Sequence, residues 1–280
     1  MTCWEWPSRR RASKLAVAIP GSVLTVEHGL LMKTVKAGII GRLLAVFRVD
    51  EVAVFRDPDA SREDTELLAK LLSYQVTPPH LKKRVYRISE EFRYAGLIPP
   101  LKIPSHTPPE KLEEGVVMYG YVEACRGSYC RVYLGKAGYG IARSTLRPGS
   151  LVLVRIVEAK GPKAWLEVLD EDSVGVYLGY KVSVYDSVED VVGSYKRRGF
   201  MIVATSKFGE CEFRLECGRP ILIVFGGPWR GLLEYTDPRT YDMVINTVPM
   251  QGAETVRTEE ALAATLAILN FRCRDSQNDV

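Results

Sequence analysis

Residues Asn246 to Asn270 read NTVPMQGAETVRTEEALAATLAILN and join a polar loop to a helix. Thr258 is a residue type that caps helices, and Glu259 and Glu260 favour the positive end of the helix dipole. The stretch from Ala261 to Leu269 is rich in strong helix formers. Apolar residues occur on nearly every side of this helix, so we expect it to be buried on more than one side, with a second subunit as a candidate partner.

Three predicted strands in the carboxyl-terminal part of the chain each end in a loop of small and polar residues. The strands are 201–204, 221–225 and 243–245, and the loops are 205–209, 226–231 and 246–252. Ligands of open parallel sheets bind beyond the carboxyl ends of the strands, and glycines let the backbone approach a flat polar ligand. These loops are therefore the predicted binding site, although glycine-rich loops also serve as simple turns.

An alternation of strands and helices begins near the amino end of the chain. Apolar runs at 14–19 and 51–55 flank a segment with an apolar residue every four positions, which is the spacing of one helix face. The residues of this stripe are Leu31, Val35, Ile39, Leu43 and Phe47. Such a unit predicts parallel strands joined by a right-handed crossover.

The alternation continues on both sides of a different middle segment. Ser61 supplies a cap for a helix over 63–72, and after Tyr177 a strand at 181–185 precedes a helix that starts near Ser187. One α/β sheet built from the two ends of the chain is therefore expected.

Between these two α/β segments the pattern changes to short strands without helices. Prolines cluster from Pro78 to Pro109, and glycine turns then separate strands at 115–123, 128–134, 139–143, 150–158 and 163–169. Five such strands predict a small OB-like barrel, which often binds nucleic acid, with a structural spacer as the alternative. We predict an α/β parallel sheet built from residues 1–105 and 175–280, with an all-β barrel inserted at 106–174.

The charge of the chain does not identify a partner by itself. The 280 residues carry 38 Lys and Arg against 34 Asp and Glu, a net charge of +4, and only clustered charge makes an electrostatic footprint. Clusters lie at 9–14, at 196–198 and in a predicted basic amphipathic helix from about His80 to Tyr94, although a solvated surface is the commoner explanation for any one of them. No apolar run approaches the roughly 18 residues of a membrane span, and a cytoplasmic protein is expected.

The six cysteines contain no C-x-x-C pair and lie far in sequence from the three histidines. A structural zinc site is therefore not expected. Reduced, buried thiols are the expectation for all six. Cys125 and Cys130 flank a predicted hairpin turn, which leaves a local disulfide between them as the alternative.

Several motifs are spread over both ends of the chain. They are LAVAIPGS at 15–22, FRVDE at 47–51, YAGLIPP at 94–100, IVFGG at 223–227 and the loop and helix start at 246–260. Together they resemble the SPOUT (α/β-knot) class of RNA methyltransferases, in the branch with an inserted barrel. The resemblance implies a trefoil knot at the carboxyl end, a homodimer formed through the knot region, an RNA substrate, and S-adenosylmethionine held by the knot loops.

The same resemblance implies which residues contact the cofactor. They are Thr205, Ser206, Phe225, Gly226, Gly227, Thr247, Val248, Pro249, Gln251, Gly252 and Val256. No metal is implied. After Thr205 and Ser206 the resemblance leads us to expect an acidic and a basic residue, whereas this chain has Lys207 and Phe208, which weakens a catalytic role for that loop.

Methyl transfer needs an acceptor held in line with the methyl donor, so positioning supplies much of the rate. No histidine or carboxylate near the loops is an obvious general base. Arg257 is the preferred catalytic candidate, because a guanidinium beside the cofactor stabilises negative charge on an RNA base, although pairing with Glu260 is an equally good structural explanation. Arg42 is the second candidate. The predicted RNA contacts are Arg48, Lys82, Lys83, Arg84 and Arg93.

The predicted function is therefore an S-adenosylmethionine-dependent methyltransferase that acts on a base of rRNA or tRNA. Two other hypotheses stay open. One is a non-catalytic RNA-binding or ribosome-assembly factor with the same fold, and the other is an unrelated α/β enzyme that uses a nucleotide.

Overall fold

The computed structural model describes residues 5–273, which form two compact units. One unit comprises residues 5–10, 77–89 and 102–178 and contains a closed β-barrel. The other comprises residues 11–76, 90–101 and 179–273 and contains a parallel sheet. The limits 106 and 174 that the sequence suggests for the insertion stay a prediction.

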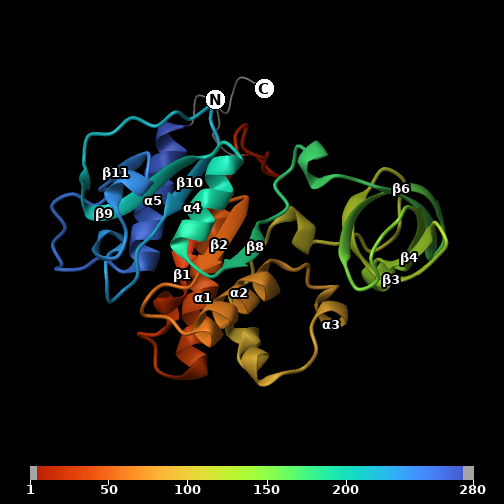
Figure 1. Cartoon of the computed structure of the whole chain (residues 1–280). Coiled ribbons are helices and arrows are strands. Elements are labelled where there is room, and N and C mark those ends of the chain that lie inside the picture. The colour runs from red at the N-terminus through yellow and green to blue at the C-terminus, as the bar shows by residue number, and fades with distance from the viewer. Residues whose placement is uncertain (1–4, 274–280) are drawn as a thin grey trace. The chain divides into compact units, whose positions relative to one another are not determined.

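The six strands of the sheet are all parallel, in the order β11-β9-β10-β1-β2-β8 (Figure 1). They are β1 (Leu15–Pro20), β2 (Glu51–Phe55), β8 (Lys181–Tyr185), β9 (Met201–Glu210), β10 (Ile221–Val224) and β11 (Met243–Ile245). Every residue of β1 and β10 is buried, as is typical of parallel strands covered on both faces. The predicted α/β sheet, assembled from both ends of the chain, is confirmed.

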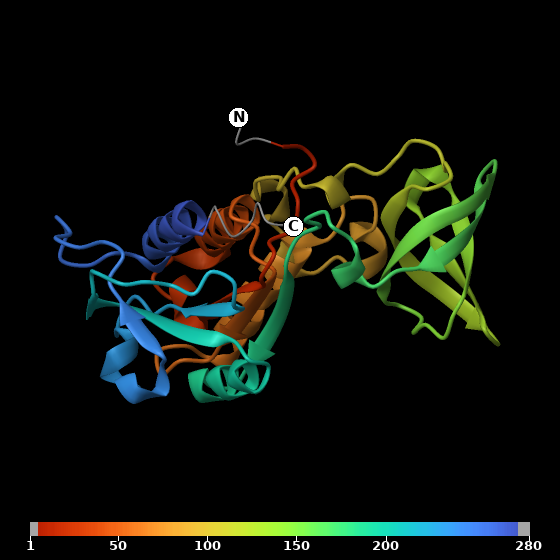
Figure 2. The ribbon, with the colours of Figure 1, turned by 90° about the horizontal axis from the view of Figure 1, so that it is seen from above.

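Four longer helices accompany the sheet: α1 (Gly29–Val46), α2 (Arg62–Val76), α4 (Val188–Arg197) and α5 (Thr258–Arg272). Figure 2 shows α4 on one side of the sheet and α1 and α5 on the other. Val191 and Tyr195 of α4 pack in one buried cluster with Phe55 of β2. The predicted cap of α2 is confirmed, because the Oγ atom of Ser61 accepts a hydrogen bond of 3.0 Å from the backbone N–H of Asp64. Ser187, near which a helix was predicted to start, caps α4 in the same way at 3.1 Å.

Short 3-10 turns complete the backbone of the described residues. They lie at Gly21–Leu24, Glu90–Phe92, Ala95–Leu97, Pro104–His106, Gly135–Ala137, Glu171–Ser173, Leu232–Glu234 and Pro238–Thr240. No helix in the described part of the chain is long and apolar enough to cross a membrane.

The apolar stripe predicted for α1 lies on the helix but not in the core. Leu31 and Ile39 are 40% and 45% exposed. The buried side of α1 is instead made of small and apolar residues, including Ala37, Ile40 and Leu44. α1 therefore presents an apolar face that nothing in the described chain covers completely.

The barrel closes in the order β3-β4-β5-β7-β6. Its strands are β3 (Val117–Arg126), β4 (Tyr129–Tyr133), β5 (Tyr139–Arg143), β6 (Leu151–Lys160) and β7 (Lys163–Val168). Buried and exposed residues alternate along β4 and β7, so one set of side chains fills the interior and the other faces solvent. The predicted five-stranded barrel is confirmed.

The basic amphipathic helix predicted from His80 to Tyr94 is wrong. Only α3 (Lys82–Val85) is α-helical, and at Tyr86 the backbone becomes extended, with φ −112° and ψ 131°. None of the residues of α3 is buried. Without an apolar face to bury, so short a helical segment gains too little from packing to propagate.

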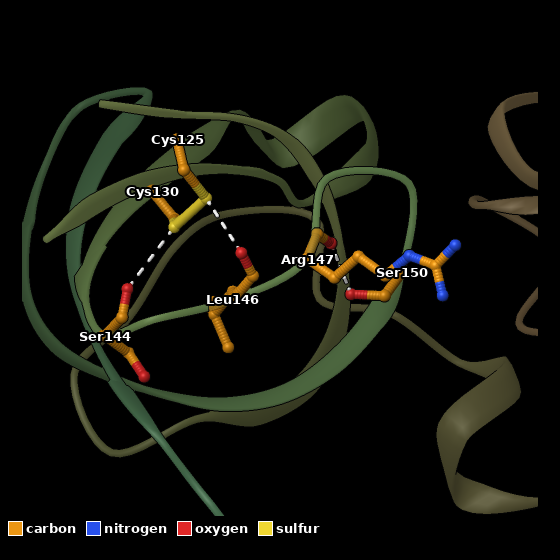
Figure 3. The surroundings of a disulfide bond; sticks show 6 residues. All are labelled: Cys125, Cys130, Ser144, Leu146, Arg147 and Ser150. Carbon is orange, nitrogen blue, oxygen red and sulfur yellow. Dashed lines mark hydrogen bonds between the residues drawn. A yellow bond between two sulfur atoms is a disulfide. The ribbon is translucent and has the colours of Figure 1, made fainter. Parts of the chain in front are cut away.

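The expectation of six reduced thiols is also wrong. Cys125 and Cys130 form the local disulfide that the hairpin turn had offered as the alternative (Figure 3). Their sulfur atoms lie 3.4 Å from the carbonyl oxygens of Leu146 and Ser144, which Figure 3 draws beside the disulfide.

A second disulfide joins Cys217 to Cys273 across 56 positions, which no local pattern in the sequence signals. It connects the segment between β9 and β10 to the end of α5. Beside it, Arg272 of α5 donates a hydrogen bond of 2.5 Å to the carbonyl of Phe213 and stacks over the Phe213 ring.

Replacing both Cys217 and Cys273 with serine is expected to lower the free energy of unfolding by up to about 4 kcal/mol, because the closed loop restricts the unfolded chain. Urea unfolding followed by circular dichroism measures this change. Cys211→Ser is the control, since Cys211 is exposed and unbridged. An unchanged unfolding midpoint in the double variant would contradict the stabilising role.

Candidate active site

One pocket of about 270 Å³ lies at the carboxyl ends of β9, β10 and β11. Parallel pairing of β10 with β9, and of β9 with β11, brings these three strand ends to the same edge of the sheet. The volume of this pocket is near the lower end of the range for small-molecule sites. Its walls are the last part of β9 and the loops after β10 and β11. The sequence predicts these three segments, although it predicts a loop at 205–209 where β9 continues to Glu210.

The first wall is an excursion of β9. Val244 of β11 pairs with Ala204, but the next residue, Ile245, pairs with Glu210. Residues 205–209 therefore leave the ladder and project toward the pocket, although the backbone remains extended. Asn246 holds this excursion in place, since its side chain donates a hydrogen bond of 3.1 Å to the carbonyl of Lys207.

The second wall is the loop after β10, and three contacts fix it. Trp229 Nε1 donates to Thr25 Oγ1 at 2.8 Å, and Glu234 Oε1 accepts from the Gly231 N–H at 2.7 Å. Arg230 binds both carboxylate oxygens of Asp59 at 2.6–3.1 Å, and this guanidinium lowers the pKa of Asp59. A loop held at three points is preorganised for a ligand.

The third wall joins the loop after β11 to α5. The Thr258 hydroxyl, on the first turn of α5, donates a hydrogen bond of 3.0 Å to the carbonyl of Gly226. The hydroxyls of Thr247 and Thr265 are 2.8 Å apart. An ion pair connects α5 to α1: Nζ of the buried Lys36 in α1 lies 3.3 Å from a carboxylate oxygen of Glu259 in α5.

The structure brings most of the predicted cofactor residues together. Nine line the pocket: Thr205, Ser206, Phe225, Gly226, Gly227, Thr247, Val248, Gln251 and Val256. Pro249 and Gly252 are not among its lining residues. Gln251 is held in place by two hydrogen bonds from its side-chain amide to the carbonyls of Ala253 and Glu254.

The two predicted catalytic arginines lie apart. Arg257 is exposed and sits between the pocket-lining residues Val256 and Thr258. Its backbone N–H donates to Glu260 Oε2 at 2.9 Å, so the contact between these residues caps the helix and does not involve the guanidinium. Arg42 lies outside the pocket lining, and its guanidinium donates to the carbonyls of Pro100 and Leu101 at 3.0 and 2.6 Å.

The predicted RNA-binding residues fall into separate groups. Arg48 lies near the end of α5, with its guanidinium 3.4 Å from Asn270 Oδ1. Arg93 pairs with Glu90 at 2.9 Å. The remaining three lie in α3, in the barrel unit: Lys82, Lys83 and Arg84. Partial burial of its ammonium group lowers the pKa of Lys82 to about 8.

Several pocket residues were not among the predicted cofactor contacts. They include Lys207, Phe208, Trp229, Leu232, Glu234 and Asn246. Most of them lie within the three loops that the sequence does indicate. Leu232 and Glu234 follow the second loop. They reach the pocket because the chain forms a 3-10 turn there, and the spacing of apolar residues in the sequence does not predict this turn.

Next to the pocket, two buried polar atoms lack a hydrogen-bond partner within the described residues. They are Ser22 Oγ and Asp57 Oδ2. An added Cβ on Gly227 would lie 2.6 Å from the first and 3.2 Å from the second. Buried polar groups are normally paired, so these two oxygen atoms behind the second wall can still form hydrogen bonds.

Comparison with known proteins identifies the family. Residues 14–269 match the family described as "Putative RNA methyltransferase". The chain belongs to this family.

Two full-length relatives extend the comparison. An uncharacterized protein of Haloarcula marismortui, rrnAC1612, is 31% identical over 91% of this chain and 98% of its own length. The human protein named 28S rRNA (uridine-N(3))-methyltransferase is 30% identical over 95% of this chain and 80% of its own length. Among solved structures, the chain is similar to the SpoU methyltransferase AviRb from Streptomyces viridochromogenes in complex with AdoMet, with 13% sequence identity and a TM-score of 0.39. The match covers 96% of this chain and 60% of the AviRb chain.

The pocket fits S-adenosylmethionine, the methyl donor of such enzymes. Phe225, Leu232 and Val248 give the pocket apolar walls of the kind that an adenine ring requires. The backbone N–H groups of Gly226 and Gly227 donate no hydrogen bond within the described residues, so they remain available to a polar ligand.

Gly226→Ala is expected to weaken S-adenosylmethionine binding at least tenfold. An added Cβ would lie 2.8 Å from the backbone nitrogen of Leu232, so the second wall has to shift. Isothermal titration calorimetry measures the affinity. Gly218→Ala is the matched control, since Gly218 lies outside the pocket lining and nothing lies within 4 Å of its added Cβ. Equal affinities in the two variants would show that the second wall does not shape the cofactor site.

Proposed function

We propose that the protein transfers the methyl group of S-adenosylmethionine to N3 of a uridine in ribosomal RNA. The observation that carries this proposal is the convergence of three strand-end loops on one pocket, in a chain that belongs to an RNA methyltransferase family. The choice of atom is supported by the names of the human and Drosophila relatives, which are 30% and 28% identical.

The cofactor supplies an electrophilic methyl group on a sulfonium. The chain supplies the fixed geometry around it. The excursion after β9 and the loops after β10 and β11 hold the adenosine and the amino-acid part in one orientation, and the restrained loops remove motion that would otherwise slow the transfer. The cofactor contacts of Pro249 and Gly252, which lie outside the pocket lining, remain part of the proposal.

Arg257 is the proposed catalytic residue. Loss of the N3 proton to solvent water leaves negative charge on the uracil ring, and a guanidinium next to the pocket would stabilise that charge until N3 takes the methyl group and the sulfonium leaves as a neutral thioether. The side chain of Arg257 is exposed, and its neighbours on both sides line the pocket. Arg42 remains a second candidate, although its guanidinium is bound to two backbone carbonyls.

Incubation of the protein with rRNA and S-adenosylmethionine carrying a deuterated methyl group is expected to yield labelled 3-methyluridine, detected by mass spectrometry of the digested nucleosides. Arg257→Ala is expected to lower kcat by about 10²-fold with little change in cofactor affinity. Arg42→Ala is the comparison variant. Label at another atom would refute the N3 assignment, and an unaffected Arg257→Ala variant would refute the role of this arginine.

We further propose that the protein is a homodimer that uses the exposed apolar face of α1 together with α5, the helix of the predicted knot region. Leu31, Met32, Ile39 and Val46 of α1 are 40–54% exposed, and Phe271 of α5, a neighbouring helix, is 72% exposed. An apolar surface of this kind on adjacent helices is typical of a protein interface.

Ile39→Arg is expected to convert the dimer to a monomer, because it places a charge in the apolar interface. Sedimentation velocity measures the oligomeric state. Ile88→Arg is the control, since Ile88 is fully exposed in the other unit. A wild-type monomer, or an Ile39→Arg variant that still dimerises, would contradict the proposed interface.

The RNA contacts of Arg48, Lys82, Lys83, Arg84 and Arg93 and the cytoplasmic location also remain proposals. Arg48, Arg84 and Arg93 have side-chain partners in Asn270, Glu123 and Glu90. Lys82 is partly buried and Lys83 is exposed, both on α3. Positive side chains on a surface bind phosphate regardless of base sequence. These residues would position the RNA rather than select the uridine.

A further inference from the structure

The outer face of the barrel carries an ordered set of rings and cations on three adjacent strands. Tyr129 of β4 pairs with Arg143 of β5, and Arg131 pairs with Ile141. Ile141 pairs in turn with Trp165 of β7. All five side chains point away from the barrel interior, because residues two apart on a strand share a face.

Two of the rings on this face are open to solvent. Trp165 is 51% exposed and Tyr129 is 46% exposed. They meet edge to face, with ring centroids 6.5 Å apart and an interplanar angle of 67°, which fixes their orientation. By contrast, the neighbouring Tyr133 and Tyr139 are covered by the guanidinium groups of Arg84 and Arg131 at 4.8 and 4.1 Å.

Cations surround the open rings. Arg143 and Lys163 are exposed and have no ion-pair partner within the described residues. Arg131 is partly neutralised by Glu123, whose carboxylate oxygen lies 3.0 Å from its Nε. Glu167 on the same side of β7 is paired with Arg155 at 2.7 Å. The unpaired charge on this face is therefore positive.

We infer that the face formed by Tyr129, Arg131, Arg143, Lys163 and Trp165 binds unpaired nucleotides of RNA. Exposed, oriented rings stack on bases that are free of a duplex, and the cations beside them bind the phosphates that connect those bases. Paired bases are already stacked within a helix and leave no ring face for Trp165. The inference rests on the proposed function, since it assigns part of the RNA substrate to the barrel.

Fluorescence anisotropy with a labelled oligouridylate of about 12 nucleotides, near the site size of an OB fold, tests the inference on the full chain without cofactor. An RNA duplex of the same length is the second probe. The wild-type protein is expected to prefer the single strand. Trp165→Ala and Tyr129→Ala are each expected to weaken its binding about tenfold, while Trp165→Phe retains most of the affinity. Val157→Ala is the control, on an exposed position of β6.

The salt dependence separates the rings from the cations. Arg143→Ala is expected to reduce the slope of log affinity against log salt by about one, because one phosphate contact is lost. Trp165→Ala and Arg143→Lys leave the slope unchanged. Circular dichroism confirms that each variant is folded.

Unchanged affinity in both Trp165→Ala and Tyr129→Ala would overturn the inference and leave the face to a protein partner. Equal affinity for duplex and single strand would also overturn it. Calorimetry with S-adenosylmethionine on the same variants keeps this outcome distinct from a failure of the proposed function. The barrel variants bind the cofactor like the wild type if only the inference fails, whereas a wild-type protein without cofactor binding contradicts the function itself.

Discussion

Parallel pairing of β10 with β9 and β1 is the constraint on which the active-site region depends. Because these strands run in one direction, their carboxyl ends share one edge of the sheet, and the last part of β9 and the loop after β10 meet there. β11 joins the same edge through β9, with residues 205–209 displaced from the ladder. The hydrogen bond from Thr258 to the Gly226 carbonyl then fastens α5 to the second loop. A pocket for a small polar ligand results directly from strand direction.

The apolar faces of α1 and α5 are only partly covered within a single chain. Both helices are apolar on more sides than the sheet covers, and residues such as Ile39 and Phe271 remain exposed. In the proposed dimer, a second copy of the chain would cover both helices at once and would also add rigidity to α5, which carries one wall of the pocket. The proposed dimer therefore connects the oligomeric state to the cofactor site.

Strand and helix periodicity was sufficient to predict the sheet, the barrel and the site loops after β10 and β11, whereas the loop predicted at 205–209 is a continuation of β9. The strands at 51–55, 139–143, 181–185 and 243–245 have the observed limits, since local patterns of burial and turn residues define them. The basic helix at His80–Tyr94 was wrong because charge spacing alone does not provide a buried face. The Cys217–Cys273 bridge depends on the tertiary path over 56 positions. The positions of Glu234 and Arg42 also depend on the tertiary path, so no local pattern in the sequence predicts them. The knot was implied only by the family resemblance.

Amide hydrogen exchange with and without S-adenosylmethionine tests most directly whether the three strand ends form one cofactor site. The account predicts that the cofactor slows exchange in three separate segments together, at 205–208, 225–234 and 246–258, and leaves the barrel strands at 117–168 unchanged. Protection confined to one of these loops, or located outside them, would contradict a site assembled from all three.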